Sequence, residues 1–169
     1  MKMTASLINA LTATLISSFA PSLFAADTTE KPSTSQMHYT AESQPPFPVK
    51  GQYFTGEVQV DRLFPENPEA HYSGAYVHFQ PSARSAWHYH PAGQHIVVIS
   101  GTALTGTRDG NIISIKPGET IWCPPNLDHW HGASREGAMT HLVITGSKDG
   151  QNVVWKEKVS DDIYNASKH

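Results

Sequence analysis

Residues 87–101 read WHYHPAGQHIVVISG. His88 and His90 stand two positions apart, and alternate side chains of a β-strand point to the same face. A Pro-Ala-Gly turn follows, then Gln94 and an apolar run that ends at Gly101. This order predicts a strand, a turn and a second strand that bring two imidazoles and one side-chain carbonyl within reach of one point.

Residues 117–132 read PGETIWCPPNLDHWHG and contain a second histidine pair. His129 and His131 again stand at i and i+2, so we expect them to share a face. Histidine is a common metal ligand and proton carrier. Six of the ten histidines lie in the middle of the chain: His88, His90, His95, His129, His131 and His141.

The two stretches resemble the two sequence motifs of the cupin family. The first motif, G-x5-H-x-H-x3,4-E-x6-G, appears as His88, His90, Gln94 and Gly101, with Ser82 at the leading glycine. The second, G-x5-P-x-G-x2-H-x3-N, appears as Gly118, Pro124 and His129, with Asn126 at the glycine and Ala133 at the last position. The main departure is Gln94, which stands where the family has an acidic ligand.

Three shorter phrases are similar to small bacterial cupins that include manganese-dependent hydroxynitrile lyases. They are AWHYHPAGQ, HWHGA and AMTHL, at residues 86–94, 129–133 and 138–142. The resemblance implies an all-β double-stranded β-helix, or jelly-roll barrel, and a homodimer or larger homo-oligomer paired edge to edge. The absence of an internal repeat predicts a single cupin domain.

The hydrophobic pattern by itself also indicates an all-β protein, because short alternating stretches are separated by turn residues. An Asp-Gly pair predicts a hairpin within residues 104–115. Prolines predict a loop at residues 63–69. Asp161 to Tyr164 is expected to start a short helix.

Four segments follow from composition. Residues 1–26 have an apolar middle and small residues at Ala25 and Ala26, which predicts a secretory signal peptide, with an uncleaved anchor or a core helix as the alternative. Residues 27–50 are rich in Pro, Ser and Thr and are expected to be a disordered linker. The domain is expected at 51–160 and a C-terminal tail at 161–169. We therefore expect export, to the periplasm in a Gram-negative bacterium, with no membrane contact in the mature form.

The chain has 169 residues, which is enough for one domain, and a net charge of −3 with neutral histidine. No cluster of Lys and Arg indicates a nucleic-acid surface, so we expect a small-molecule substrate. The single cysteine, Cys123, excludes an internal disulfide and is expected to be a buried apolar residue rather than a nucleophile.

His88, His90, Gln94 and His129 are the expected metal ligands, and they leave positions open for substrate or water. Imidazole with oxygen ligands suits Mn, Fe, Zn, Ni or Cu, and the resemblance favours Mn. A neutral Gln94 leaves a divalent site at +2. One missing anion about 4 Å away changes the energy of a bound group by roughly 4 kcal/mol at an effective dielectric of 20, so the site should favour anions. Alternatively, Gln94 only preserves geometry.

His131 and His141 are candidates for proton transfer, because neutral histidine can take a proton from an alcohol near pH 7. The alternative is that they form hydrogen bonds that orient the metal ligands. His78 and His95 are expected to face outward. The cavity is expected to be lined by three residues: Ala75, Val77 and Trp87.

The resemblance implies a metal-dependent C–C lyase that splits a cyanohydrin into an aldehyde and cyanide, with His141 or His131 as the base. Three alternatives remain. A dioxygenase would need oxygen and a redox metal, and a secreted metal-binding or ligand-binding protein would hold metal without turnover. A sugar isomerase or epimerase is a weaker alternative. Predicted export and the lack of a helix-turn-helix segment oppose a transcription regulator.

Overall fold

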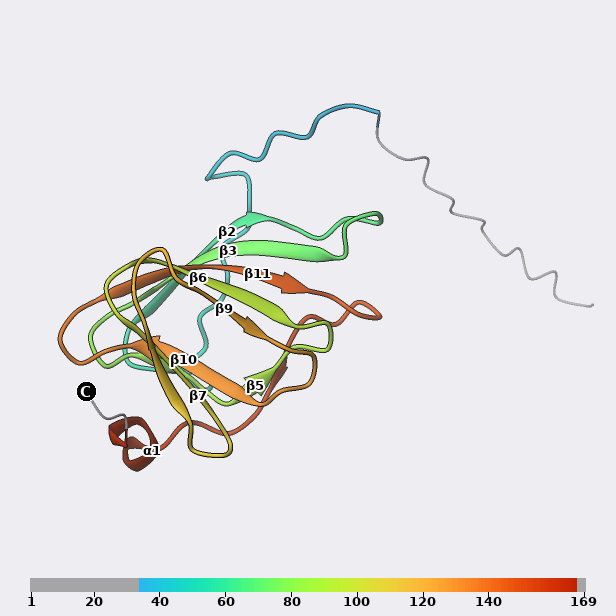
Figure 1. The fold of residues 1–169 in the computed structure, drawn as a ribbon. Helices are drawn as coiled ribbons and strands as arrows, with labels where there is room; N and C mark the ends of the chain where they lie inside the picture. Colours follow the sequence, from blue (N-terminus) through green and yellow to red (C-terminus); the bar gives the residue numbers. More distant parts are fainter. Residues whose placement is uncertain (1–33, 167–169) are drawn as a thin grey trace, which may run out of the picture. The chain divides into compact units, whose positions relative to one another are not determined.

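The computed structural model describes residues 34–166 and contains two antiparallel sheets and one short helix in that range (Figure 1). The seven-stranded sheet contains β1 (Phe54–Thr55), β4 (Arg84–Ser85), β5 (His88–Tyr89), β7 (Ala103–Thr107), β8 (Ile112–Ile115), β10 (His129–Ala133) and β12 (Val154–Trp155). The five-stranded sheet contains β2 (Val58–Phe64), β3 (Tyr72–Phe79), β6 (Gln94–Ser100), β9 (Thr120–Cys123) and β11 (Met139–Gly146).

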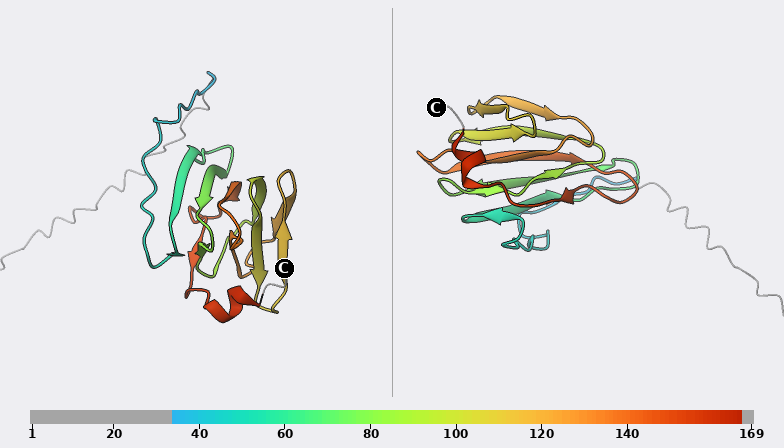
Figure 2. Two further views of the ribbon diagram at one scale, coloured as in Figure 1. Left: turned by 90° about the vertical axis from the view of Figure 1, so that its left-hand side faces the viewer. Right: turned by 90° about the horizontal axis from the view of Figure 1, so that it is seen from below.

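The two sheets face each other, as two views of the ribbon show (Figure 2). Strand order is β2-β3-β11-β6-β9 in one sheet and β1-β4-β10-β5-β12 in the other, where β7 also pairs with β10 and β8. Neighbouring strands therefore come from distant parts of the chain, as a jelly roll requires. This architecture confirms the predicted all-β fold.

Strand β11 illustrates how side-chain alternation places polar groups in the interior. Every second residue is buried, beginning at Met139 and continuing through His141, Val143 and Thr145. These four residues therefore share the inner face of the strand. The strand is central, between β3 and β6, so its inner face packs against the core that contains Phe79.

Two motif positions without glycine still adopt the backbone conformation that favours glycine. Ser82 has a φ of 68° and Asn126 a φ of 63°. The left-handed region costs an ordinary residue about 1–2 kcal/mol, and asparagine is among the residues that visit it most readily. The backbone N–H of Asn126 also donates to the carbonyl of His90 at 3.0 Å. This turn therefore joins the second motif to the first.

A second apolar cluster lies with helix α1 (Asp161–Asn165). It contains Trp87, Leu104, Trp130, Val159 and Tyr164. Trp87 was predicted to line the cavity, and this prediction is wrong. Its neighbour His88 faces the cavity, so strand alternation directs the Trp87 ring the other way, where the Arg108 guanidinium lies 4.0 Å from the ring centroid.

The remaining local predictions can be compared with the structure. The hairpin is confirmed as β7 and β8, and the short helix as α1. The loop predicted at 63–69 begins later, because β2 continues to Phe64.

Residues 34–50 contain no helix or strand, but Phe47 packs against the core. The predicted signal peptide and the first part of the predicted linker lie outside the described residues. Within residues 34–166, no helix is both long and apolar enough to span a bilayer.

Candidate functional site

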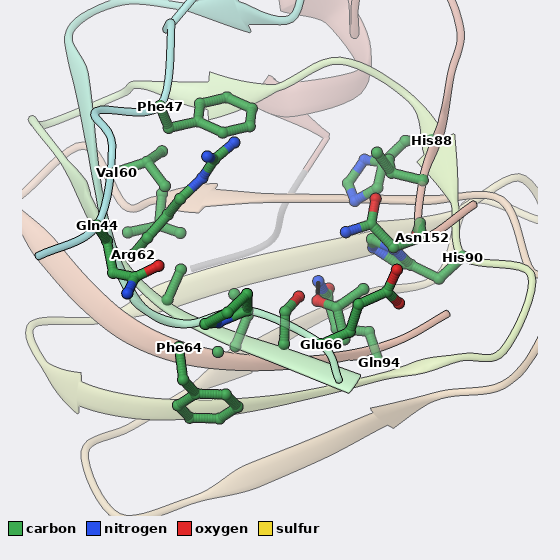
Figure 3. A pocket seen from close by; sticks show the side chains of 18 of the residues that line it. Gln44, Phe47, Val60, Arg62, Phe64, Glu66, His88, His90, Gln94 and Asn152 are labelled. Carbon is green, nitrogen blue, oxygen red and sulfur yellow. Dashed lines mark hydrogen bonds between the residues drawn. The ribbon is translucent and has the colours of Figure 1, made fainter. Parts of the chain in front are cut away.

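A cavity of about 420 Å³ opens into the interior of the barrel. His88, His90, Gln94 and His131 contribute its polar wall. Apolar residues line much of the rest, and they include Ala75 and Val77, as predicted, together with Phe54, Val143 and Trp155. Figure 3 shows His88, His90 and Gln94 grouped on one side of this cavity. The volume is in the range of natural small-molecule sites.

Three buried histidines are oriented by backbone carbonyls. Nδ1 of His88 lies 3.0 Å from the carbonyl oxygen of Ala86. Nδ1 of His90 lies 2.5 Å from that of Asn152, and Nδ1 of His129 lies 3.0 Å from that of Leu127. A carbonyl only accepts hydrogen bonds, so each Nδ1 carries the proton and donates it. Each Nε2 is then a lone-pair donor. Metal-binding histidines are commonly held in this way.

Three of the four predicted ligands have a buried metal-binding atom without a hydrogen-bond partner among the described residues. Nε2 of His90, Nε2 of His129 and Oε1 of Gln94 are buried without a partner among the described residues. The Gln94 amide nitrogen instead donates to the Thr145 hydroxyl at 2.8 Å. Leaving a buried polar atom unpaired costs about 1–3 kcal/mol. A bound cation would satisfy all three atoms, so the predicted ligand residues fit a metal centre.

The environment keeps these imidazoles neutral. Burial lowers the pKa of His88 well below 6.5, and the neighbouring His129 and His90 lower it further. Burial lowers the pKa of His90 to about 4, and it lowers that of His129 as well. Neutral imidazole is the form that binds metals.

His131 and His141 form a pair behind this cluster. Nδ1 of His131 lies 3.0 Å from Nε2 of His141, and the backbone N–H of His131 donates to Ser85 Oγ at 3.1 Å. Burial lowers the pKa of both residues, that of His141 to about 4. His131 lines the cavity, whereas His141 is fully buried and does not. Of the two predicted bases, His131 is the one that lines the described cavity.

A second ligand set was missed by the sequence reasoning. Ligand nitrogens of His88, His129 and His131 all lie within 4.8 Å of one another. His131 could therefore replace His90 as a metal ligand. The i, i+2 spacing of His129 and His131 was the signal available for it. His90, however, is held through Nδ1 by a backbone carbonyl, as metal-binding histidines commonly are, whereas Nδ1 of His131 contacts His141. This difference favours the predicted set.

Other histidines lie where they were expected. His78 faces outward, with Nε2 at 3.0 Å from Asp61 and Nδ1 at 2.9 Å from Thr140. His95 is exposed and packs on the Trp122 ring. Cys123 is buried, and burial raises the pKa of its thiol to about 12, as expected for a structural residue.

Several residues of the site were not predicted. Thr145 alternates with His141 along β11, which was the available signal for its inward position. Asn152 contributes a backbone carbonyl to His90. Every residue type has such a carbonyl, so the sequence gives no sign of this role. Arg62 and Glu66 also line the cavity. They were missed because charged residues in or beside a loop are normally exposed to solvent.

The central part of the chain is similar to known proteins. A model for the cupin domain matches residues 75–145. An (R)-mandelonitrile lyase from Granulicella tundricola is 44% identical over 112 residues, which cover 66% of this chain and 86% of that protein.

Two solved structures share the fold. A cupin-like protein from Thermotoga maritima has a TM-score of 0.65 and 30% identity, covering 69% of this chain and 88% of its own. A polyketide cyclase from Streptomyces resistomycificus has a TM-score of 0.55 at 17% identity, covering 78% and 92%, and this likeness concerns the fold alone.

Proposed function

The chain belongs to the cupin family, and we propose that it is a metal-dependent lyase that splits a cyanohydrin into an aldehyde and cyanide. One observation carries the proposal: within residues 34–166, three buried atoms of the expected ligands, on His90, Gln94 and His129, lack partners beside a cavity of substrate size. The relationship to a mandelonitrile lyase supports the choice of reaction.

We assign the metal to His88, His90, Gln94 and His129, with Mn as the proposed ion. Three imidazoles and one neutral amide suit several divalent transition metals. When bound, the ion would supply Lewis acidity and positive charge to the reacting group. The protein contributes oriented lone pairs, because backbone carbonyls and the Thr145 hydroxyl hold the four side chains in place.

His131 is the proposed base. Its Nε2 would accept the proton of the cyanohydrin hydroxyl. The oxygen's electron pair then forms the aldehyde C=O bond, and the C–CN bond breaks with its electron pair leaving on cyanide. Return of the proton from His131 to cyanide gives HCN and restores neutral imidazole. His141 acts as a positioning residue, because its Nε2 lies 3.0 Å from Nδ1 of His131.

The apolar wall serves the same chemistry by limiting water. Phe54, Val77 and Trp155 line the cavity, and Phe54 and Trp155 pack edge to face at 5.5 Å. A less polar cavity strengthens the interaction between a positive centre and a developing anion. It also accommodates an aromatic or aliphatic aldehyde.

The proposal is tested by aldehyde release from racemic mandelonitrile under strict anaerobiosis, using Mn(II)-loaded protein. Metal-free protein and His88→Ala are the negative controls. His78→Ala is the matched histidine control, because His78 faces outward. We expect release that requires metal and His88 and is independent of oxygen. No release above the negative controls would refute the cyanohydrin assignment, and an absolute requirement for oxygen would favour a dioxygenase.

We also propose that the protein is exported and that it self-associates. Mass spectrometry of the chain from a cell fraction enriched in periplasm should find an N-terminus near residue 26. Sedimentation of this mature form should give a dimer or larger species. An intact N-terminus in the cytosolic fraction, or a monomer at all concentrations, would contradict the respective proposal.

A further inference from the structure

One arginine in the cavity has no acidic or hydrogen-bonding partner among the residues that the structure describes. Arg62, on β2, lines the cavity and is partly buried. Within residues 34–166 it makes no hydrogen bond or ion pair, although its guanidinium lies 5.3 Å from the centroid of the Phe47 ring. The other arginines differ, because Arg84 and Arg108 pair with carboxylates and Arg135 bonds the Asn165 amide.

The guanidinium is held at the end of the cavity remote from the histidines. Figure 3 shows it beside the Phe47 ring, with His88 and His90 on the opposite side of the view. Glu66 also lines the cavity, but its carboxylate is drawn on the side of Gln94 and Asn152. No ion pair joins Glu66 to Arg62 in the described residues. The positive charge of Arg62 is therefore not neutralised by Glu66. The adjacent acid in the sequence, Asp61, pairs with His78 instead.

An unpaired guanidinium in a cavity is suited to bind an anion. Its five N–H donors lie in a plane and match the two oxygens of a carboxylate. The guanidinium lies over the Phe47 ring, 5.3 Å from its centroid, and cation–π attraction limits its motion. Arg62 is thus oriented before a ligand arrives, which lowers the cost of binding.

We propose that Arg62 binds a carboxylate at the far end of the substrate, so that the natural substrate is a cyanohydrin of an aldehyde that also carries a carboxylate. This inference rests on the proposed lyase function. The reacting carbon would lie at the histidine cluster, and the carboxylate would pair with Arg62. The apolar lining, which includes Val60, Ala75 and Val143, would contact the uncharged part of the molecule.

The kinetic test compares 4-carboxymandelonitrile and mandelonitrile with the Mn(II)-loaded full chain. Arg62→Met should lower kcat/KM for the carboxylated substrate relative to mandelonitrile by about 10-fold to 100-fold, the range for a hydrogen bond to a charged group. Arg135→Met is the matched control, because Arg135 also lies over an aromatic ring, 5.8 Å from that of Tyr164, but does not line the cavity. It should leave the ratio of the two kcat/KM values unchanged. An equal ratio in the wild type and Arg62→Met would overturn the proposal.

A binding measurement separates this inference from the proposed reaction. Calorimetry should show tighter binding of 4-formylbenzoate than of benzaldehyde to the wild type, and Arg62→Met should abolish the difference. Arg62→Lys keeps the positive charge and should retain part of the difference in affinity, so it serves as a second, conservative variant. Glu66→Gln should leave or increase the preference, since it removes a negative charge from the cavity.

The two proposals fail differently. Cleavage of mandelonitrile with a carboxylate preference independent of Arg62 would overturn the subsite and leave the lyase function standing. Binding of 4-formylbenzoate that depends on Arg62, without cleavage of either cyanohydrin, would support the subsite and refute the lyase reaction. Loss of the preference in Glu66→Gln, rather than in Arg62→Met, would also overturn the assignment to Arg62.

Discussion

The side-chain amide of Gln94 donates to the Thr145 hydroxyl at 2.8 Å, and this bond determines which end of the amide faces the histidines. The amide nitrogen is occupied, so the carbonyl oxygen Oε1 is left buried with no partner in the described part of the chain. Gln94 and Thr145 are also register partners on β6 and β11. The hydroxyl therefore supports the metal ligand without touching the metal.

Replacing Thr145 with valine should weaken metal binding. The variant keeps the size and branching of the side chain but removes the acceptor of the Gln94 amide, so the amide can rotate. Loss of a group that orients a ligand typically costs about 10-fold to 100-fold in metal affinity. Competition between the protein and a chelating dye for Mn(II) measures this change.

The matched control is Thr140→Val on the same strand. The Thr140 hydroxyl contacts His78 on the outer face, so its removal should leave Mn(II) affinity within the error of the assay. Equal affinity of Thr145→Val and the wild type would show that the hydroxyl does not orient the ligand.

Replacing Gln94 with the acid of the family motif should change metal affinity and anion affinity in opposite directions. Gln94→Glu adds one negative charge beside the cation, so it should tighten Mn(II) binding by about tenfold or more and weaken inhibition by azide by a similar factor. Chelator competition and inhibition kinetics measure the two effects. Unchanged inhibition by azide would mean that the neutral amide only preserves geometry.

The histidine pair predicts unequal effects on turnover. His131→Ala should lower kcat by about 10²-fold to 10⁴-fold, as expected for loss of a general base, while Mn(II) affinity is retained. His141→Ala should cost less, because His141 contacts His131 and not the cavity. Added imidazole should restore part of the activity of His131→Ala but not of His141→Ala. The reverse pattern of rescue would make His141 the base.

The fold protects Cys123 from reaction. Burial raises its thiol pKa from 9.0 to about 12, so the folded protein at pH 8 has about 10³-fold less thiolate than the unfolded chain, and thiolate is the reactive form. Iodoacetamide should therefore label Cys123 slowly until guanidinium unfolds the protein. Rapid labelling of the folded state would refute a buried structural thiol.

The same pKa shift predicts the sign of a stability effect. Between about pH 9 and 12 the unfolded thiol loses its proton and the folded thiol keeps it. The unfolded state then binds fewer protons, so the free energy of unfolding should fall as the pH rises through this range. Cys123→Ala should show a smaller decline in denaturant titrations.

Local patterns predicted the part of the site that depends on local geometry. His88 and His90 stand at i and i+2 beside a turn, and Gln94 begins the next strand, so alternation alone directs them inward. The same rule explains why the prediction that Trp87 lines the cavity was wrong. Adjacent residues point to opposite faces, and His88 points inward, so Trp87 points outward. Helix α1 then covers the outer face at Trp87 and Trp130.

Contacts between the sheets could not be predicted in this way. The His131–His141 contact joins β10 of one sheet to β11 of the other, and its length depends on how the sheets pack. Phe47 lies in a segment whose composition indicated a disordered linker, yet one aromatic ring there packs on the core and supports Arg62. One aromatic residue between prolines gives no periodic signal.

The most direct test of the account is the position of a bound metal. Crystals of the Mn(II)-loaded protein, measured near the manganese absorption edge, would locate the ion from its anomalous scattering. We predict a peak bound by Nε2 of His88, His90 and His129 and by Oε1 of Gln94, with His131 left free beside the cavity. A peak bound by His88, His129 and His131, with His90 unbound, would contradict both the proposed metal site and the proposed base.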